Sequence, residues 1–287
     1  MIGSLKSLLG NVLFGDAPRK KFVPVRLSPD EIQEKVFIVN AAEEKDISFD
    51  HCIVCHEPFL MATLSEGTKI EVRRNGKLCA DAHLRLKHKV DSILVYEIIS
   101  TRSYQLPYWR QYILQKGYFL RGKKDSFLQG MIYAAMYAFP RRVIAVSYKD
   151  DSYFNIFPMD FQCYIERENM MLFGLRTTNI TLKKILAAKK LVVSDTTSVD
   201  FETIYDLGRN HSAAPPSLDK LPFGVIKSDK FGFNVPEFSA SYKEIEIVNS
   251  VELGTHTMMV GRVVGYKKIK DEWSYVHHVH FFEVASI

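Results

Sequence analysis

Hydrophobic and polar residues alternate along much of residues 69 to 87, which is typical of half-buried β-strands. Asn75-Gly76 lies between two such runs and is the strongest two-residue hairpin signal in the chain. After it, one face of the predicted strand is apolar and consists of Leu78, Ala80, Ala82, Leu84 and Leu86. We therefore expect an antiparallel β segment here. Residues 93 to 100 follow as a buried strand or a short helix, since periodicity does not separate the two.

Two other parts of the N-terminal half have helical features. Ser28-Pro29-Asp30-Glu31 has the form of a capping box with proline at the first helical position, which predicts a short helix through Val36. Residues 104 to 139 are rich in aromatic residues and glutamine, and they predict helix that stops at Pro140. So many large rings in a short region favour an interface, and we expect a homodimer. Alternatively, these aromatic rings pack in a purely internal core.

From residue 142 onward the pattern predicts strands again. They cover about residues 143–147, 162–165, 170–175, 191–194, 241–251, 257–267 and 277–284. One clear helix, Ile180 to Ala188, lies among them, and residues 200 to 238 form a long connection with some helix. This tally predicts a mainly β protein, a barrel with helical decoration. We expect two units: an antiparallel β segment with short helices at residues 1–110, and the barrel at residues 111–287.

Composition and charge exclude several classes of protein. At 47% hydrophobic and 25% charged residues the chain is globular, not disordered. Its net charge of +5 is spread along the sequence and not concentrated in a stripe, so we expect no nucleic-acid partner. No apolar run approaches the roughly 20 residues that a membrane helix needs. Four cysteines make no disulfide framework, and the N-terminus is no convincing signal peptide, so we expect a cytoplasmic protein.

Metal and haem motifs are weak in this sequence. Cys52-Ile-Val-Cys55-His56 matches the pattern for covalent haem attachment, but its setting is strand-like and no export signal precedes it. A zinc site would need a second pair at suitable spacing, and Cys79 and His83 alternate with core residues instead. His278 and His280 share one face of a predicted strand, where hydrogen-bonded or solvated imidazoles are the simpler interpretation. We predict no metal site.

The segment Arg176-Thr177-Thr178-Asn179 is the most informative polar cluster. It follows a predicted strand and leads directly into the helix predicted near Ile180, and Thr181 adds a hydroxyl in the first turn. A guanidinium, short polar side chains and a helix N-terminus together favour an anion site. Alternatively, Thr178 or Asn179 only caps the helix and Arg176 lies on the surface. Composition alone does not separate these two hypotheses.

Four segments occur in a characteristic order. They are Pro140-Arg-Arg-Val-Ile-Ala-Val-Ser147, Asn155-Ile-Phe-Pro158, Arg176 to Ile185, and Val251-Glu-Leu-Gly-Thr-His256-Thr-Met-Met-Val-Gly261-Arg-Val-Val264. In this order they resemble the flavin reductase-like, FMN-binding split-barrel family, over about residues 126 to 284. The resemblance implies a split β-barrel that binds FMN at a homodimer interface. It also implies hydride transfer from NAD(P)H, as a co-substrate, through the bound flavin to an acceptor.

The resemblance implies roles for individual residues. Those expected beside the isoalloxazine are Asn155, Phe157 and Pro158. Those expected to hold the phosphate are Arg176, Thr177 and Thr181, with Thr178 and Asn179 nearby. His256 is expected near the flavin or substrate and is the candidate catalytic residue. Two positions depart from the family pattern: Met159-Asp160-Phe161 stands where a small Ser or Thr is usual, and Thr255 replaces an Asp.

Two alternative functions remain open on the sequence. The first is a non-catalytic flavin-binding or electron-carrier protein of the same fold. The second is a flavin-free oligomeric β scaffold, whose basic residues, among them Lys183, Lys184, Lys189 and Lys190, bind an acidic partner.

Overall fold

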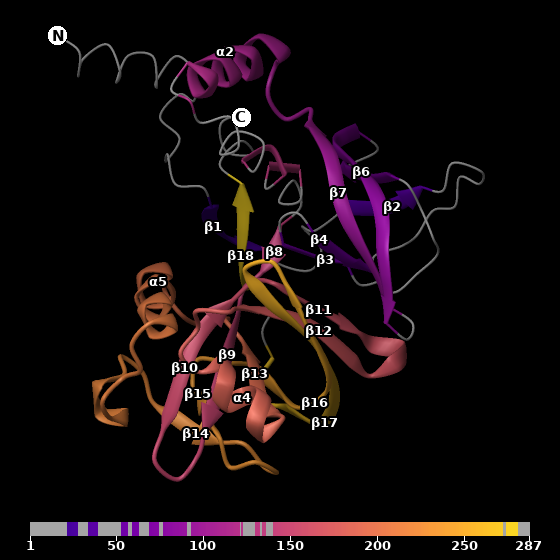
Figure 1. Ribbon diagram of the computed structural model, residues 1–287. Helices are drawn as coiled ribbons and strands as arrows, with labels where there is room; N and C mark the ends of the chain where they lie inside the picture. The colour runs from indigo at the N-terminus through magenta and orange to yellow at the C-terminus, as the bar shows by residue number, and fades with distance from the viewer. Residues whose placement is uncertain are drawn as a thin grey trace, which may run out of the picture.

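The computed structural model describes residues 22–27, 34–39, 53–56, 59–62, 69–74, 77–90, 93–120, 122, 130–132, 134–135, 140–271 and 274–280. The protein is mainly β, as predicted, and two large antiparallel sheets dominate it (Figure 1). No described helix is long and apolar enough to cross a membrane.

The C-terminal half contains a seven-stranded sheet with the order β10-β9-β13-β16-β17-β12-β11. Every neighbouring pair in it is antiparallel. Its strands are β9 (Ile144–Lys149), β10 (Phe154–Met159), β11 (Gln162–Ile165), β12 (Met170–Arg176), β13 (Lys190–Asp195), β16 (Ser241–Leu253) and β17 (His256–Lys268).

This sheet curls around a single core. Phe157 of β10 and Phe173 of β12 belong to the same buried cluster, although their strands lie near opposite ends of the strand order. Val146 and Ile245, from strands between them, complete it. Residues on the concave face of a strongly curved sheet meet in this way, so the sheet forms the predicted barrel.

Short helices and strands decorate the barrel. They are η2 (Glu166–Glu168), α4 (Leu182–Ala188), α5 (Phe201–Leu207), η3 (Gly208–His211), η4 (Leu218–Lys220), β14 (Val225–Lys227) and β15 (Asn234–Pro236). The helix predicted at Ile180 begins at Leu182, because the Asn179 side chain accepts the N–H of Thr181 and holds a turn there. Asp200 caps α5 by accepting the N–H of Thr203.

A small third sheet joins the two ends of the chain. Its order is β1 (Phe22–Leu27), β18 (Tyr275–His280) and β8 (Arg141–Arg142). The guanidinium of Arg26 on β1 donates to the carbonyls of Thr197 and Val199. Residues 22–27 therefore pack with the C-terminal half, and the division at residues 110 and 111 stays a prediction.

The N-terminal half forms a six-stranded antiparallel sheet with the order β2-β5-β6-β7-β4-β3. Its strands are β2 (Glu34–Val39), β3 (Ile53–His56), β4 (Phe59–Ala62), β5 (Lys69–Arg74), β6 (Lys77–Val90) and β7 (Ile93–Ser103). Arg74 pairs with Lys77, which is the register that a two-residue hairpin at positions 75 and 76 requires. Residues 93 to 100, for which strand and short helix were both open, lie in β7 and are a strand.

The helix predicted through Val36 is wrong at its C-terminal end. Glu34, Lys35 and Val36 lie in β2, where Val36 pairs with Val72 of β5. The run from Val36 to Val39 is rich in β-branched residues, which favour a strand. Pairing with β5 therefore outweighs the local capping signal for a helix. Residues 28 to 33 of that prediction lie outside the described residues.

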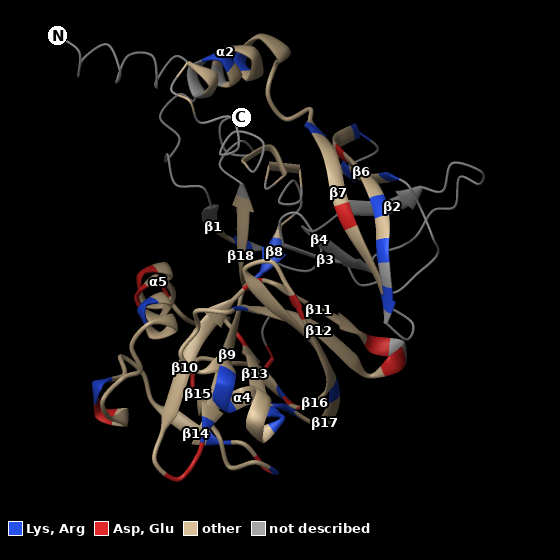
Figure 2. Ribbon diagram, viewed as in Figure 1, with Lys and Arg blue, Asp and Glu red and all other residues tan. Residues whose placement is uncertain are grey.

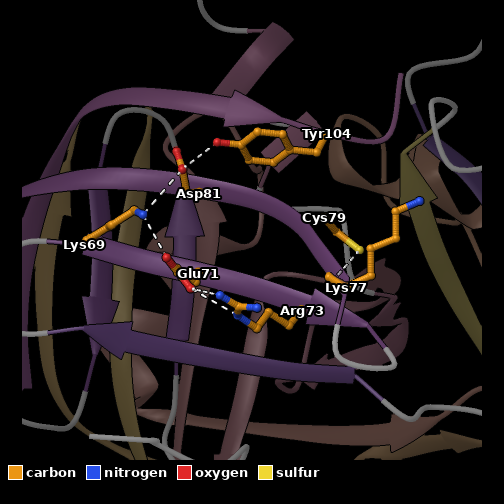
Figure 3. Close-up of polar contacts among 7 residues, drawn as sticks. All are labelled: Lys69, Glu71, Arg73, Lys77, Cys79, Asp81 and Tyr104. Atoms are coloured by element: carbon orange, nitrogen blue, oxygen red, sulfur yellow. Dashed lines mark hydrogen bonds and ion pairs between the residues drawn. The ribbon is translucent and has the colours of Figure 1, made fainter. Parts of the chain in front are cut away.

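The polar face of this sheet is held by ion pairs (Figure 3). Glu71 of β5 pairs with Lys69 at 2.8 Å and with Arg73 at 2.8 Å. Hydrogen bonds from Lys69, and secondarily from Arg73, lower the pKa of the Glu71 carboxyl. Asp81 of β6 accepts a hydrogen bond from the Tyr104 hydroxyl at 3.0 Å. The pairs of Glu71 lie along β5 itself, whereas Lys69 also reaches Asp81 of the neighbouring strand β6 at 3.6 Å, which is a cross-strand pair.

The apolar face of β6 follows the predicted alternation only in part. Ala80, Ala82 and Leu84 are buried, but Leu86 is 40% exposed. Register shifts between His83 and Leu84, and beyond Leu86, interrupt the strict two-residue period. The expected orientation is therefore confirmed for Ala80, Ala82 and Leu84 and wrong at Leu86, while Leu78 is half-buried.

The six-stranded sheet packs on the outside of the barrel. Val95 of β7 belongs to a buried cluster with Leu172 of β12, Leu253 of β16 and Met258 of β17. Figure 1 shows β3 and β4 passing beside β11 and β12, and β3 contacts both of these barrel strands. The helix predicted over residues 104–139 is confirmed for α2 (Tyr108–Phe119) and for helical turns at 130–132 and 134–135.

Candidate functional site

A pocket of about 410 Å³ lies against the barrel. Its volume lies within the range of small-molecule sites, roughly 300–1,000 Å³. Six separate parts of the chain line it: Val143 before β9, the end of β10 with the turn to β11, the end of β12 with the loop after it, the α5–η3 segment, and single residues of β17 and β18. The lining residues are Val143, Pro158, Met159, Asp160, Phe161, Gly174, Leu175, Arg176, Thr178, Asn179, Ile204, Tyr205, Gly208, His211, Ser212, His256 and His278.

Arg176 supplies the exposed cation of this pocket. It is the last residue of β12 and pairs across the ladder with His256, the first residue of β17. In the part of the chain that the structure describes, no carboxylate forms an ion pair with its guanidinium. The next residue, Thr177, donates its N–H to the carbonyl of Thr255 at 3.0 Å, which anchors the loop that follows. An unpaired guanidinium at a pocket wall is suited to an anionic ligand.

His211 links two walls of the pocket. Its Nε2 lies 2.9 Å from the carbonyl of Pro158, and its Nδ1 lies 2.8 Å from the Asn179 amide nitrogen. Burial lowers its pKa, opposed by the bond to Pro158, and the charge of Arg176 lowers it further. A neutral ring satisfies both contacts when Nε2–H donates to the carbonyl and Nδ1 accepts from the amide. His211 thereby fixes Asn179 against β10.

A chain of buried hydrogen bonds continues beneath the pocket floor. The Asn179 carbonyl oxygen accepts the N–H of Thr181 at 2.8 Å. The Thr181 hydroxyl lies 2.8 Å from the Tyr153 hydroxyl and accepts from the Asn155 amide at 2.8 Å. Asn155 also donates to the carbonyl of Asn210 at 2.8 Å. These bonds join β10, α4 and η3 and hold the loop between β12 and α4 in one conformation.

The predicted cofactor residues divide into two groups in this geometry. Pro158, Arg176, Thr178, Asn179 and His256 line the pocket. Three others, Asn155, Phe157 and Thr181, are 0% exposed and lie behind its wall, where they pack or bond to protein groups. Thr177 is exposed at the start of the loop and is no part of the lining. The roles of all these residues toward a ligand stay predictions.

The helix N-terminus contributes little to this site. α4 has only seven residues, and its N-cap Thr181 makes no side-chain capping bond. A helix this short carries a weak dipole, and the Thr181 side chain is committed to Tyr153 and Asn155. The expected anion site at a helix start therefore reduces to Arg176 and the loop, with Thr178 and Asn179 as polar neighbours.

A second polar group lies on the pocket wall formed by β18. His278 Nδ1 is 2.9 Å from Asp160 Oδ2, a contact between the C-terminal strand and the β10–β11 turn. The imidazole of His278 stacks on the ring of Tyr205 from α5, with centroids 5.9 Å apart and planes 18° apart. Burial, and then the charge of Asp160, raise the pKa of Tyr205, so its phenol is neutral at neutral pH.

His256, the predicted catalytic residue, is 3% exposed at the pocket wall. Its Nδ1 lies 3.1 Å from the Thr255 hydroxyl, and its ring packs against Phe161 with centroids 5.4 Å apart. Arg141 extends this stack on Phe161, with its guanidinium carbon 5.5 Å from the ring centroid. The position where the sequence departs from the family pattern, Thr255, is thus the hydrogen-bond partner of the imidazole.

Among the described residues, no group of three or more His, Cys, Asp or Glu side chains could hold a metal ion. Of the haem-like motif, Cys52 and the side chains of Cys55 and His56 lie outside the described residues. Cys79 forms no disulfide bond. His277 is buried and His278 pairs with Asp160, as a hydrogen-bonded interpretation of these histidines predicts.

Basic residues of the described part of the chain occur on both sheets. Figure 2 shows Lys and Arg scattered over both sheets, with a small group on α4. One of that group, Lys184, pairs with Asp150 at 2.8 Å.

Sequence reasoning missed four residues of the pocket wall. Asp160 was noted only as a departure from the family pattern, and His278 only as a metal-ligand candidate. Tyr205 and His211 lie in the long connection of residues 200 to 238, where no motif marks them. Their signal is tertiary, because α5 and η3 reach the pocket only when that connection folds back over β10.

No family model matches this sequence. No curated protein matches it either. Similarity to solved structures is modest and covers about half of the chain. The flavin reductase component of a bacterial two-component tryptophan halogenase is 13% identical, with a TM-score of 0.45, over 52% of this chain and 96% of that protein.

Two further solved structures show likeness of the same degree. An FMN-binding protein from Thermus thermophilus is 18% identical, with a TM-score of 0.40, over 45% of this chain and 73% of its own. A homologue of nitrilotriacetate monooxygenase component B from Mycobacterium thermoresistibile is 13% identical, with a TM-score of 0.46, over 54% of this chain and 89% of its own.

Proposed function

We propose that the pocket binds FMN and that the protein is an NAD(P)H-dependent flavin oxidoreductase. The observation that carries the proposal is the pairing of an exposed, unpaired guanidinium with apolar walls in one pocket. Arg176 is the cation, and the apolar surface comes from residues such as Met159, Phe161 and Leu175. FMN has the same two parts, a phosphate that carries negative charge and a flat ring system of low polarity. The four sequence segments with their family resemblance support the same ligand.

The residues of this pocket fit the chemistry of that group. Arg176 would meet the phosphate, since a guanidinium can donate to two oxygens at once. Thr178 and Asn179 offer further polar groups on the same loop. Pro158 and Phe161 would bound the ring. When bound, the flavin supplies the hydride-transfer chemistry, and the protein supplies binding, orientation and exclusion of water.

The first test is the contribution of Arg176 to phosphate binding. Replacing Arg176 with Ala should weaken FMN binding by about 1.5–3 kcal/mol, roughly tenfold to over a hundredfold, the range for a charge-assisted hydrogen bond. Riboflavin lacks the phosphate, so its weaker binding should barely change. Titration followed by flavin absorbance and fluorescence measures both affinities.

Arg209→Ala is the matched control for this test. Arg209 is a highly exposed arginine on η3, paired with Asp206 and outside the pocket lining. Its removal takes away the same charge without the proposed contact, so FMN affinity should be retained. Equal losses for FMN and riboflavin in Arg176→Ala, or no loss for either, would mean that the phosphate site is misplaced. Failure of the wild-type protein to bind flavin would refute the function itself.

Catalysis is tested separately from binding. Oxidation of NADH or NADPH in the presence of FMN would support a reductase. Flavin binding without such oxidation would instead favour a flavin-binding or electron-carrier protein. A cytoplasmic setting belongs to the same proposal.

We propose a homodimer as the assembly. The support is α2, where Tyr108 is 81% exposed and Trp109 is 50% exposed, with Leu120 after the helix at 86%. Large exposed apolar side chains in one short stretch are typical of interaction surfaces. Light scattering at micromolar concentration should give twice the mass of the chain, and a monomeric mass would contradict the proposal.

A further inference from the structure

Tyr205 is an aromatic residue of the pocket wall. It lies on α5, lines the pocket and is 37% exposed, although most large apolar residues of the barrel are buried. On one side its ring lies nearly parallel to the imidazole of His278, at a centroid distance of 5.9 Å. This separation and angle are those of an offset stack.

The ring beneath Tyr205 is itself held in place. His278 Nδ1 is fixed by Asp160 Oδ2 at 2.9 Å, and both of these side chains are largely buried. Three elements therefore converge on one aromatic stack: α5 with Tyr205, β18 with His278, and the β10–β11 turn with Asp160. Such an arrangement orients the Tyr205 ring before any ligand arrives, which lowers the entropic cost of stacking on it.

We propose that Tyr205 is the stacking platform for a planar conjugated ring bound in this pocket, with Asp160 and His278 as positioning residues. The inference deepens the proposed function and rests on it for one of two ring sources. The ring is either the isoalloxazine of the flavin or that of an aromatic electron acceptor, and both present the same flat π surface. The phenol of Tyr205 is neutral, so the platform selects for ring shape and not for charge.

Two substitutions distinguish the contribution of the aromatic ring of Tyr205 from that of its size. Tyr205→Leu removes the π surface, whereas Tyr205→Phe keeps it and removes only the hydroxyl. The probes are riboflavin, which reports the flavin ring without the phosphate, and 1,4-naphthoquinone as a simple aromatic acceptor. For the ring that stacks, Tyr205→Leu should weaken binding about threefold to tenfold, and Tyr205→Phe by no more than about twofold.

Riboflavin fluorescence gives a readout that needs no turnover. Stacking on tyrosine quenches flavin emission by electron transfer, so riboflavin bound to the wild-type protein should be strongly quenched. Tyr205→Leu should restore part of that emission at saturating protein, and Tyr205→Phe should restore less. Tyr266→Leu is the matched control, because Tyr266 is 60% exposed and lies outside the pocket lining.

The loss of affinity for each probe in Tyr205→Leu shows which ring stacks on Tyr205. A loss for riboflavin alone identifies the flavin as the stacked ring, and a loss for naphthoquinone alone identifies the acceptor. If the wild-type protein binds naphthoquinone but no flavin, the proposed function fails while the platform stands. Wild-type affinity for both probes in Tyr205→Leu, or equal losses in Tyr205→Phe and Tyr205→Leu, would overturn the platform. So would a wild-type protein that binds neither probe.

The positioning roles are tested with His278→Gln, which removes the stacked ring beneath Tyr205. It should weaken binding of the same probe and cause no further loss in the Tyr205→Leu background, because the two residues act as one unit. His277→Gln is the matched control from the same strand, since His277 lies outside the pocket lining. Additive losses in the double variant would overturn the positioning role.

Discussion

Several polar side chains near the pocket form hydrogen bonds with other protein groups. Thr181, Asn155 and Tyr153 bond to one another behind the pocket wall, and Thr181 is 0% exposed. Resemblance to a family identified Thr181 and Asn155 as ligand contacts, and the structure shows what the two side chains do within the protein. The loss of stability on removing a buried polar group depends on which hydrogen-bond partners are then left unsatisfied.

Replacing Thr181 with Val should lower the free energy of unfolding by about 1–3 kcal/mol. The substitution keeps the shape but leaves the amide of Asn155 and the hydroxyl of Tyr153 without their shared partner in a buried site. Chemical denaturation measures the loss. Thr181→Ser keeps the hydroxyl and should lose much less, so equal losses in the two variants would contradict this explanation.

His277 should make stability depend on pH. Burial lowers its pKa to about 4, from the ordinary value of 6.5, against a raising hydrogen bond to the Tyr275 carbonyl, and the charges of Arg142 and His278 add to the lowering. Between pH 6.5 and about pH 4, His277 is therefore protonated in the unfolded chain and neutral in the folded protein. Stability is complete above pH 6.5 and falls as the pH drops toward about 4, by up to about 3 kcal/mol.

Denaturation curves between pH 7 and pH 4 test this dependence, with His277→Gln as the comparison. That variant has no imidazole to protonate at this position, so its stability should decline less steeply over the same range. Parallel curves for the two proteins would show that other groups cause the acid sensitivity.

At the scale of elements, close approach between strands constrains the barrel. Gly261 lies in β17 between Met171 of β12 and Ile247 of β16. A Cβ at this position would collide with a methyl group of Ile245 and would lie 3.2 Å from the ring of Phe173. The glycine of the family-like segment in β17 therefore permits tight packing of the barrel core.

Gly261→Ala should destabilise the protein by about 1–3 kcal/mol, the usual cost of overpacking a well-filled core. Gly208→Ala is the control, because nothing lies within 4 Å of a Cβ at Gly208 and its φ of −57° suits alanine. Thermal or chemical unfolding measures both variants. A neutral Gly261→Ala would mean that Ile245 can move aside without cost.

The outcomes for individual elements follow from how local their signals are. The hairpin around positions 75 and 76 and the strands of the barrel were predictable, since alternation and turn residues act over a few positions. The helix through Val36 was not, because strand pairing with β5 outweighed a capping box. The exposure of Leu86 depends on register shifts that no periodicity announces.

At the scale of the whole molecule, the N-terminal sheet and the barrel share a buried cluster. Val95 is 0% exposed and packs with Leu172, Leu253 and Met258 from three barrel strands. Two sheets joined through apolar contacts of this kind stabilise each other. We therefore expect the two halves to unfold together and not as independent units.

Val95→Ala should lower the unfolding free energy by about 1–3 kcal/mol, from the lost methyl burial and the cavity left behind. The loss should extend to the barrel, so hydrogen exchange of amides in β12 and β17 should accelerate. Val248→Ala, at a site that is 47% exposed, is the control and should be nearly neutral. Faster exchange confined to the N-terminal sheet would show that the halves are energetically separate.

The fold class, the main strands of the barrel and one feature of the pocket, Arg176, were predictable from the order of residues alone. Arg176 was identifiable because a cation, a polar loop and a strand end lie within a few residues, so the signal is local. Only the tertiary structure decided that Asp160, Tyr205, His211 and His278 join it. These residues come from a turn, two helical segments and the C-terminal strand, up to 118 positions apart in a single contact. Their proximity depends on how the barrel closes and how the long connection folds back. Neither of these produces a periodic pattern of hydrophobic and polar residues in the sequence.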